Sequence, residues 1–284
     1  MHDVIAPVVD ASFLAAHPEA VVADVRWYLD GRDGRAAFEA SHLPGAVWVD
    51  LETALAAHDL PATEGRHPFP TPKAFAAAMG ALGIGDDTLV VAYDDGGGMT
   101  SGRLVAMLRM LGRDAAVLDG GLLAWTAEGR PVETGPARTP TPAMFTAAPW
   151  PSDRFASADE ALAHAAHGGA VIDARAAERF TGEVALIDPR PGHIPGARNA
   201  PWASVLGADG RFRSPDELRT HFESLGATGG STIAYCGSGV SACMNLLAME
   251  RAGLTPPRLY VASWSGWSAD ADRPVELGPA EDSR

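Results

Sequence analysis

Short apolar runs alternate with longer amphipathic stretches along this 284-residue chain. A short run rich in β-branched residues predicts a buried strand, and a longer stretch with apolar residues on one face predicts a helix. In the first half, such segments follow one another at residues 21–25, 35–41, 73–82, 89–93, 101–111 and 116–118. Strands that alternate with helices favour an α/β fold, in which a mostly parallel sheet is covered by helices on both faces.

Several phrases of the first half return in the same order in the second half. The paired phrases are residues 21–26 with 170–175, 41–46 with 192–197, and 90–94 with 232–236. Each half then closes with a tryptophan followed by Arg-Pro-Val-Glu. The repeat is too long for a solenoid, so the pattern predicts one domain duplicated. We expect domains at residues 1–135 and 153–284, joined by a proline-rich linker at 136–152.

A cysteine stands where a predicted strand ends and a predicted helix begins. Cys236 lies in the stretch 235–242, which follows the short apolar run 232–234 and precedes the helix-like segment 243–250. The loop between them is rich in glycine and serine, so its backbone can curl and point N–H groups at the sulfur, while the helix N-terminus adds partial positive charge. Four loop residues are expected to contact a bound substrate through their backbone N–H groups: Gly237, Gly239, Val240 and Ser241.

Such surroundings favour a thiolate over a thiol, which would make Cys236 a nucleophile. Its position agrees with this interpretation, because ligands of parallel sheets bind outside the carboxyl ends of the strands. The alternative is a buried structural cysteine at a strand end.

The composition narrows the possible partners. A formal net charge of −14 and a pI near 5.0 argue against nucleic acid or an anionic membrane surface as the main partner. Two cysteines are too few for a disulfide framework, which indicates a reducing compartment. The N-terminal residues lack a basic region followed by a long apolar core, and no later segment is apolar for eighteen residues. We therefore expect a soluble, cytoplasmic protein.

No metal or other cofactor is expected from the two cysteines. Cys236 and Cys243 are seven residues apart and have no matching pair of histidines. A structural zinc site would need four ligands. Cys243 falls two helical turns beyond Cys236 and is expected to belong to the core.

The phrase at residues 38–46, its partner at 193–197 and the cysteine loop together resemble the tandem rhodanese-domain sulfurtransferases, over nearly the whole chain. The resemblance implies two rhodanese-like domains. The first is expected to be catalytically inactive, because Asp94 stands where the second has its cysteine. His42 and His193, each in a His-x-Pro-Gly turn, are expected to be structural hydrogen-bonding groups rather than bases. The chain departs from the family near its end, where Gly266 replaces the glutamate of a Trp-x-Glu-Trp phrase.

The residues after the cysteine bear on the sulfur donor. Thiosulfate-preferring rhodaneses place two basic residues there, whereas Cys-Gly-Ser-Gly-Val in this chain is similar to the mercaptopyruvate sulfurtransferases. The absence of both charges should weaken the binding of a thiosulfate dianion. By the same resemblance, Ser238 would transfer a proton with help from a histidine and an acid. The implied catalytic residues are Cys236, Ser238, His67 and Glu52, and the implied substrate-binding arginines are Arg179 and Arg190.

The expected reaction moves sulfane sulfur from 3-mercaptopyruvate, through a Cys236 persulfide, to a thiol, thioredoxin or cyanide acceptor. A thiosulfate:cyanide sulfurtransferase is the first alternative, and a non-catalytic sulfur-carrier module is the second. A cysteine hydrolase is the third, although no motif places a histidine to activate Cys236. A cysteine phosphatase is disfavoured, because Ala242 stands where an arginine after a Cys-x5 loop would clamp phosphate.

Overall fold

The computed structural model describes residues 5–185 and 187–279 and forms two compact units. The first unit contains residues up to 57 together with 69–150 and 206–212, and the second contains 58–68, 151–205 and the residues from 213 onward. The predicted domain limits, 1–135 and 153–284, stay a prediction. The compact units differ from these limits in that each contains a short segment from the other half of the sequence. Residues 58–68 belong to the second unit and residues 206–212 to the first.

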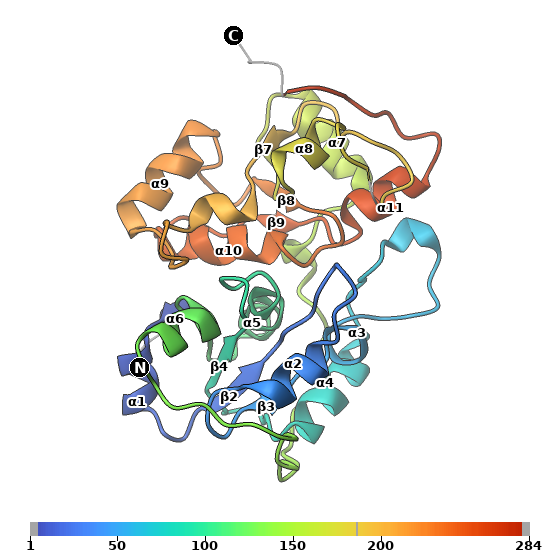
Figure 1. The fold of residues 1–284 in the computed structure, drawn as a ribbon. Helices are drawn as coiled ribbons and strands as arrows, with labels where there is room; N and C mark the ends of the chain where they lie inside the picture. The colour runs from blue at the N-terminus through green and yellow to red at the C-terminus, as the bar shows by residue number, and fades with distance from the viewer. Residues whose placement is uncertain (1–4, 186, 280–284) are drawn as a thin grey trace. The chain divides into compact units, whose positions relative to one another are not determined.

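A parallel sheet flanked by helices forms the first unit (Figure 1). Among the described residues, its strands lie in the order β1-β5-β4-β2-β3, and all neighbouring pairs are parallel. The strands are β1 (Val8–Val9), β2 (Val21–Asp24), β3 (Val47–Trp48), β4 (Val90–Tyr93) and β5 (Ala115–Leu118). The helices are α1 (Ala11–Ala16), α2 (Gly34–Ala40), α3 (Leu51–Ala54), α4 (Pro72–Ala81), α5 (Ser101–Met110) and α6 (Gly121–Ala127). The predicted alternation of strands and helices is therefore confirmed.

The second unit repeats this architecture with a parallel sheet in the order β7-β6-β8-β9 among its described residues. Its strands are β6 (Val171–Asp173), β7 (Arg198–Asn199), β8 (Ile233–Tyr235) and β9 (Arg258–Leu259). Its α-helices are α7 (Ala158–Ala166), α8 (Ala177–Phe180), α9 (Pro215–Ser224), α10 (Ala242–Arg251) and α11 (Ser263–Ala269). Its 3-10 helices are η1 (Ala62–Glu64), η2 (Ser152–Arg154) and η3 (Trp202–Val205).

The two repeated histidines perform the same structural task in their own units. The Nδ1 atom of His42 lies 2.9 Å from the carbonyl oxygen of Phe38, and that of His193 lies 2.8 Å from the carbonyl oxygen of Phe180. Each imidazole ring also stacks on the phenylalanine that it bonds, with ring centroids 3.9 and 3.7 Å apart. Both rings are buried, so these contacts account for them as packing groups.

A buried aspartate–arginine pair closes the first long strand of each unit. Arg26 contacts Asp24 at 2.7 Å, and Arg175 contacts Asp173 at 2.6 Å. Each guanidinium also donates to the carbonyl oxygen of a distant turn residue. Buried ion pairs of this kind are costly to break, because removal of one partner leaves an uncompensated charge. Both pairs therefore tie the end of a strand to the turn that follows.

Helix α11, which hydrogen-bonds to the cysteine loop, is anchored in the core of the second unit. Trp264 and Trp267 from α11 are fully buried among apolar side chains that include Phe180 and Tyr235. Large aromatic side chains of this kind dominate core energetics. No helix in the described part of the chain is long and apolar enough to cross a membrane.

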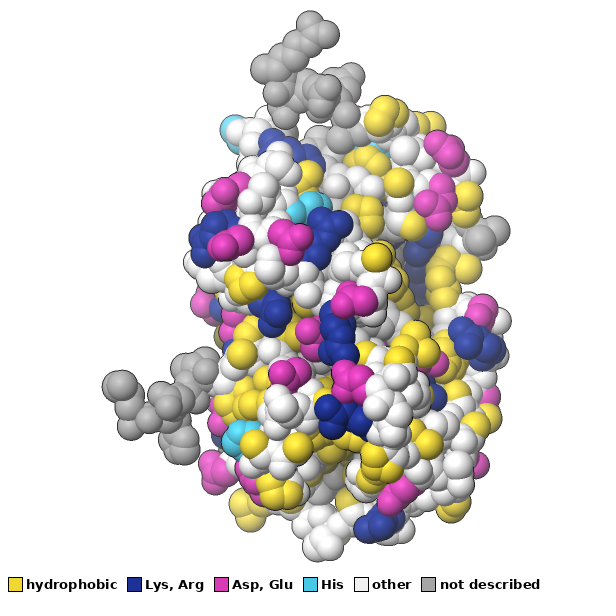
Figure 2. All heavy atoms as spheres, turned by 60° about the vertical axis from the view of Figure 1, so that its left-hand side comes forward, with side chains coloured by type: hydrophobic (Ala, Val, Ile, Leu, Met, Phe, Trp, Pro, Cys, Tyr) yellow, Lys and Arg dark blue, Asp and Glu magenta, His cyan; other side chains and the backbone are white. Residues whose placement is uncertain are grey.

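Charged side chains of both signs are interspersed over the face drawn in Figure 2. Ion pairs among the described residues include Arg113 with Asp86 at 2.6 Å and Arg258 with Glu160 at 2.7 Å. The acidic excess of the chain is thus not gathered into one patch on this face.

Candidate active site

The cysteine loop joins β8 to α10 in the second unit. Cys236 is buried, with 1% of its surface exposed, and the Gly239 N–H donates to its Sγ at 3.1 Å. Gly239 has a φ of +75°, a left-handed conformation that turns its N–H back toward the sulfur and that glycine adopts without strain. The N-terminus of α10 follows at Ala242. A backbone donor and a helix N-terminus both stabilise negative charge on sulfur.

Helix α11 holds the loop from its backbone side. The Cys236 N–H donates to Ser263 Oγ at 3.1 Å, and the Trp264 N–H donates to the Cys236 carbonyl at 2.9 Å. The Ser265 N–H donates to the Gly237 carbonyl at 2.9 Å. Ser263 itself has a φ of +54°, which is unfavourable for a residue with a side chain. These bonds hold Ser263 in that conformation, so the start of α11 and the cysteine loop form one rigid support.

A serine and a histidine meet beside the nucleophile. Ser238 and His67 are 9% and 4% exposed, and the His67 Nδ1 lies 2.8 Å from Ser238 Oγ. Ser238 comes from the cysteine loop and His67 from the segment 58–68, both within the second unit. The structure therefore brings together a hydroxyl and an imidazole that the sequence separates by 171 positions. Such a pair can pass a proton to or from a reacting group next to the cysteine.

Two glycines let the segment 58–68 approach α11 closely enough to deliver that histidine. A Cβ atom at Gly65 would lie 2.4 Å from the Ala262 carbonyl oxygen, and a Cβ at Gly266 would lie 2.5 Å from the Thr63 carbonyl oxygen. Neither position has room for a side chain. The departure from the family at Gly266 therefore has a physical reason. It also affects the site, because the residues directly after Gly65 enter it.

Two arginines flank the loop above Gly237. An ideal Cβ at Gly237 would lie 3.1 Å from Arg179 Nη2 and 3.3 Å from Arg66 Nη2. One carboxylate links them, because Asp188 accepts from Arg66 Nη1 at 2.7 Å and from Arg179 Nη2 at 2.5 Å. Burial raises the pKa of Asp188, but hydrogen bonds from Arg179 and Arg66 outweigh it and hold the pKa below its ordinary value. Arg179 was expected here, whereas Arg66 and Asp188 were not.

Arg190, the second arginine expected to bind substrate, is engaged elsewhere. Its guanidinium donates to the carbonyl oxygens of Trp267, Ser268, Asp270 and Arg273 at distances between 2.6 and 3.2 Å. It thus satisfies carbonyl groups that the end of α11 leaves without helical partners. Its expected role as a substrate-binding arginine stays a prediction.

A model of the rhodanese-like domain matches residues 12–128 of the chain and, a second time, residues 157–270. This protein belongs to the rhodanese family. A probable 3-mercaptopyruvate sulfurtransferase of Pseudomonas aeruginosa is 42% identical over 268 residues, which cover 93% of this chain and 94% of that protein. A putative thiosulfate sulfurtransferase of Mycobacterium tuberculosis is 40% identical over 275 residues, which cover 95% of each chain. A solved structure, the 3-mercaptopyruvate sulfurtransferase from Leishmania major, has a TM-score of 0.81 and 35% identity, and covers 92% of this chain and 73% of that one.

These matches confirm the expected tandem rhodanese architecture and identify the chain as a sulfurtransferase. Its relatives are named for different donors, even at nearly equal identity. The names of relatives therefore do not decide between mercaptopyruvate and thiosulfate.

The first rhodanese domain holds a carboxylate in the loop where the second holds a thiol. Asp94 accepts the backbone N–H groups of Gly96, Gly98, Thr100 and Ser101 at 2.8 to 2.9 Å, and the hydroxyl groups of the last two at 3.0 Å. This loop is an anion-binding cradle that its own side chain fills. An aspartate cannot carry a transferable sulfur, which agrees with the expectation that this domain is inactive.

For three further residues expected in the site, the structure shows surroundings but no contact that bears on the expected role. Glu52 lies in the first unit, where it accepts from Trp27 Nε1 at 2.8 Å, and its expected role beside His67 stays a prediction. Val240 is buried within the cysteine loop, and Ser241 directly precedes α10 without a side-chain cap. Their expected backbone contacts with a bound donor also stay predictions.

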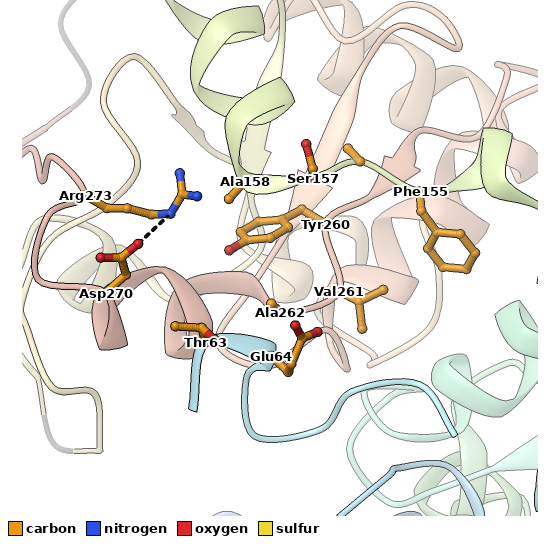
Figure 3. Close-up of a pocket in the computed structure, with 12 residues that line it drawn as sticks. Thr63, Glu64, Phe155, Ser157, Ala158, Tyr260, Val261, Ala262, Asp270 and Arg273 are labelled. Carbon is orange, nitrogen blue, oxygen red and sulfur yellow. Dashed lines mark ion pairs between the residues drawn. The ribbon is translucent and has the colours of Figure 1, made fainter. Parts of the chain in front are cut away.

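A cavity of about 380 Å³ lies along η1 and the start of α11 (Figure 3). Tyr260 lines it, and burial raises the pKa of this tyrosine to about 12, so its hydroxyl stays neutral near neutral pH. An ion pair between Arg273 and Asp270, at 3.4 Å, borders it on one side. Cys236 does not line this cavity, which is therefore distinct from the sulfur site.

Proposed function

We propose that this rhodanese takes sulfur from 3-mercaptopyruvate onto Cys236 and passes it to a thiol, a thioredoxin or cyanide. The observation that supports this donor is the hydrogen bond between Ser238 and His67 beside the cysteine. A ketoacid donor leaves as a carbon base and needs a proton, whereas thiosulfate leaves as sulfite and needs none. A buried proton-transferring pair is thus useful for the first donor only.

In the first half-reaction, the Cys236 thiolate attacks the sulfur of the donor. The carbon–sulfur bond breaks, and its electron pair goes to the carbon and forms the enolate of pyruvate. Ser238 gives that carbon a proton and regains one from His67, and His67 is reprotonated from water. The persulfide remains on Cys236, where the Gly239 N–H, already 3.1 Å from Sγ, stabilises its charge.

In the second half-reaction, an acceptor thiolate or cyanide attacks the outer sulfur of the persulfide. The sulfur–sulfur bond breaks, and the Cys236 thiolate is restored for another cycle. The two half-reactions give ping-pong kinetics. A free, reactive thiol of this kind suits the reducing cytoplasm, which we propose as the compartment.

Arg179 and Arg66 are proposed to hold the donor's carboxylate. Both guanidiniums lie over Gly237, next to the nucleophile, and arginine binds carboxylates through a planar pair of donors. This pairing replaces the expected one of Arg179 with Arg190.

Thiosulfate remains the second candidate donor. It is favoured by the same two guanidiniums, because a dianion also binds to paired cations, and by the name of the Mycobacterium tuberculosis relative. Transfer from thiosulfate would use Cys236 and the arginines, but it would leave Ser238 and His67 without a chemical role.

A Ser238→Ala variant tests the proposal with both donors. With 3-mercaptopyruvate we expect kcat/KM to fall about 100-fold, the usual scale for a lost proton-transfer group, while the value for thiosulfate changes by less than about threefold. Ser204→Ala is the matched control, because Ser204 Oγ lies 3.1 Å from His221 Nε2 in a second serine–histidine pair. It should behave as the unaltered enzyme with both donors. Equal losses with the two donors, or a strong preference of the unaltered enzyme for thiosulfate, would overturn the proposal.

A further inference from the structure

One carboxylate joins the two guanidiniums that flank the cysteine loop. The Asp188 side chain is 2% exposed and accepts from Arg66 on one oxygen and from Arg179 on the other. Arg66 also donates to the carbonyl oxygen of Ile187 at 3.2 Å, which fixes its end of the bridge. Two like charges would repel one another at this spacing, so the carboxylate is what keeps them side by side.

We propose that Asp188 is the positioning residue that sets donor choice, because it aims Arg66 and Arg179 over the loop and limits their combined charge. This inference rests on the proposed function and adds the residue that discriminates between donors.

The charge of the cluster follows from its members. Arg66 and Arg179 contribute two positive charges and Asp188 one negative charge, which leaves one positive charge over the loop. Arg175 also lies 3.8 Å from Asp188, but Asp173 neutralises it through its own ion pair at 2.6 Å. A single net charge matches the one carboxylate of a ketoacid. Thiosulfate carries two negative charges and would gain more from a doubly charged site.

The ion pairs of Asp188 differ from ordinary surface ion pairs, which contribute little to stability or binding. Its carboxylate is almost fully enclosed, and its removal would leave two partly buried guanidiniums without their partner. The guanidinium groups would then separate, which lowers the affinity for a monoanion that needs both. At the same time, the net charge would double and favour a dianion.

An Asp188→Asn variant should therefore change the ratio of the two donor efficiencies. We expect kcat/KM for thiosulfate, divided by that for 3-mercaptopyruvate, to rise about fivefold to tenfold, because the second negative charge of thiosulfate meets a second net positive charge on guanidiniums that are partly exposed to water. The change should arise mainly from KM. Asp188→Glu keeps the charge and should keep the ratio within about twofold, even if both rates fall.

A second readout does not depend on turnover. The rate at which iodoacetamide alkylates Cys236 can be measured with sulfate as a dianionic protector and pyruvate as a monoanionic one, at constant ionic strength. In Asp188→Asn, protection by sulfate relative to pyruvate should strengthen by the same factor. The matched control is Asp86→Asn, which removes the partner of Arg113 in the first unit and changes the net charge equally. It should leave both ratios unchanged.

The outcomes separate the two proposals. If the unaltered enzyme prefers thiosulfate, the proposed function fails, and the protection ratio still tests Asp188. If Asp188→Asn melts without a cooperative transition, Asp188→Ser supplies the neutral side chain in a smaller volume. A folded neutral variant whose donor ratio and protection ratio both equal those of the unaltered enzyme would overturn the role of Asp188, whichever donor the enzyme prefers.

Discussion

The filled cradle of the first domain predicts a large stability loss from a single-atom change. In Asp94→Asn, one carboxylate oxygen becomes an NH2 group within a loop that offers six hydrogen-bond donors. The hydroxyls of Thr100 and Ser101 can rotate and accept from that NH2 group. Backbone N–H groups cannot. Whichever way the amide turns, either Gly96 and Gly98 or Thr100 and Ser101 retain two backbone donors without an acceptor.

Each buried donor left without a partner costs about 1–3 kcal/mol. We therefore expect two such donors to lower the free energy of unfolding of the first unit in Asp94→Asn by about 2–6 kcal/mol. The control is Asp95→Asn, which removes the same charge from the next residue but can still accept from the Tyr28 hydroxyl, now 2.6 Å away. Its cost should stay below about 1 kcal/mol.

Urea unfolding followed by amide hydrogen exchange of β4 peptides reports the first unit by itself, so the measurement does not assume that both units unfold together. Equal unfolding free energies for Asp94→Asn and Asp95→Asn would refute the view that this loop is a cradle for a charged group.

Two further substitutions separate binding from support. Gly237→Ala places a methyl group about 3.1 Å from Arg179, so we expect KM for the ketoacid to rise about tenfold with little change in melting temperature, because flexible side-chain ends can yield. Arg190→Ala removes the donors that satisfy the end of α11, so we expect a loss of about 2–3 kcal/mol in stability and less than a threefold change in KM. A tenfold rise in KM with unchanged stability would instead return Arg190 to the substrate site.

Much of the fold was predictable because its signals are local. Each of these signals can be recognised within about a dozen consecutive residues. They are the short β-branched runs, the amphipathic stretches and the repeated His-x-Pro-Gly turn. The cysteine loop was predictable for the same reason. Its glycines and its place between a strand and a helix specify a turn that faces an anion.

The charged part of the site depends on packing between distant segments. Arg66 reaches the loop because Gly65 and Gly266 allow residues 58–68 to lie against α11. No local sequence pattern predicts that these two segments pack together. The role that we propose for Asp188 depends on the two arginines that it joins, which the sequence places far apart. The contacts of Arg190 were unforeseen for a related reason, because the carbonyl groups that it bonds lie 77 to 83 residues further along the chain.

The neutral residues of the cysteine loop also account for only part of the charge around the nucleophile. The absence of two basic residues after Cys236 predicts a loop that itself contributes no positive charge, while Arg179 and Arg190 were expected to bind the donor from other segments. In the structure, Arg66 and Arg179 supply that charge from other segments of the same unit. Under our proposal, donor choice depends on how much of this charge Asp188 cancels, rather than on the loop alone.

The most direct test of the account is the position of the transferred sulfur. The enzyme is exposed to 3-mercaptopyruvate without an acceptor, alkylated, and analysed by fragment-ion mass spectrometry that separates Cys236 from Cys243. We predict close to one additional sulfur atom per chain on Cys236, none in Cys236→Ser, and a nearly normal amount in Cys243→Ser. Sulfur on Cys243, or a Cys236→Ser variant that still releases pyruvate at the rate of the unaltered enzyme, would contradict the account.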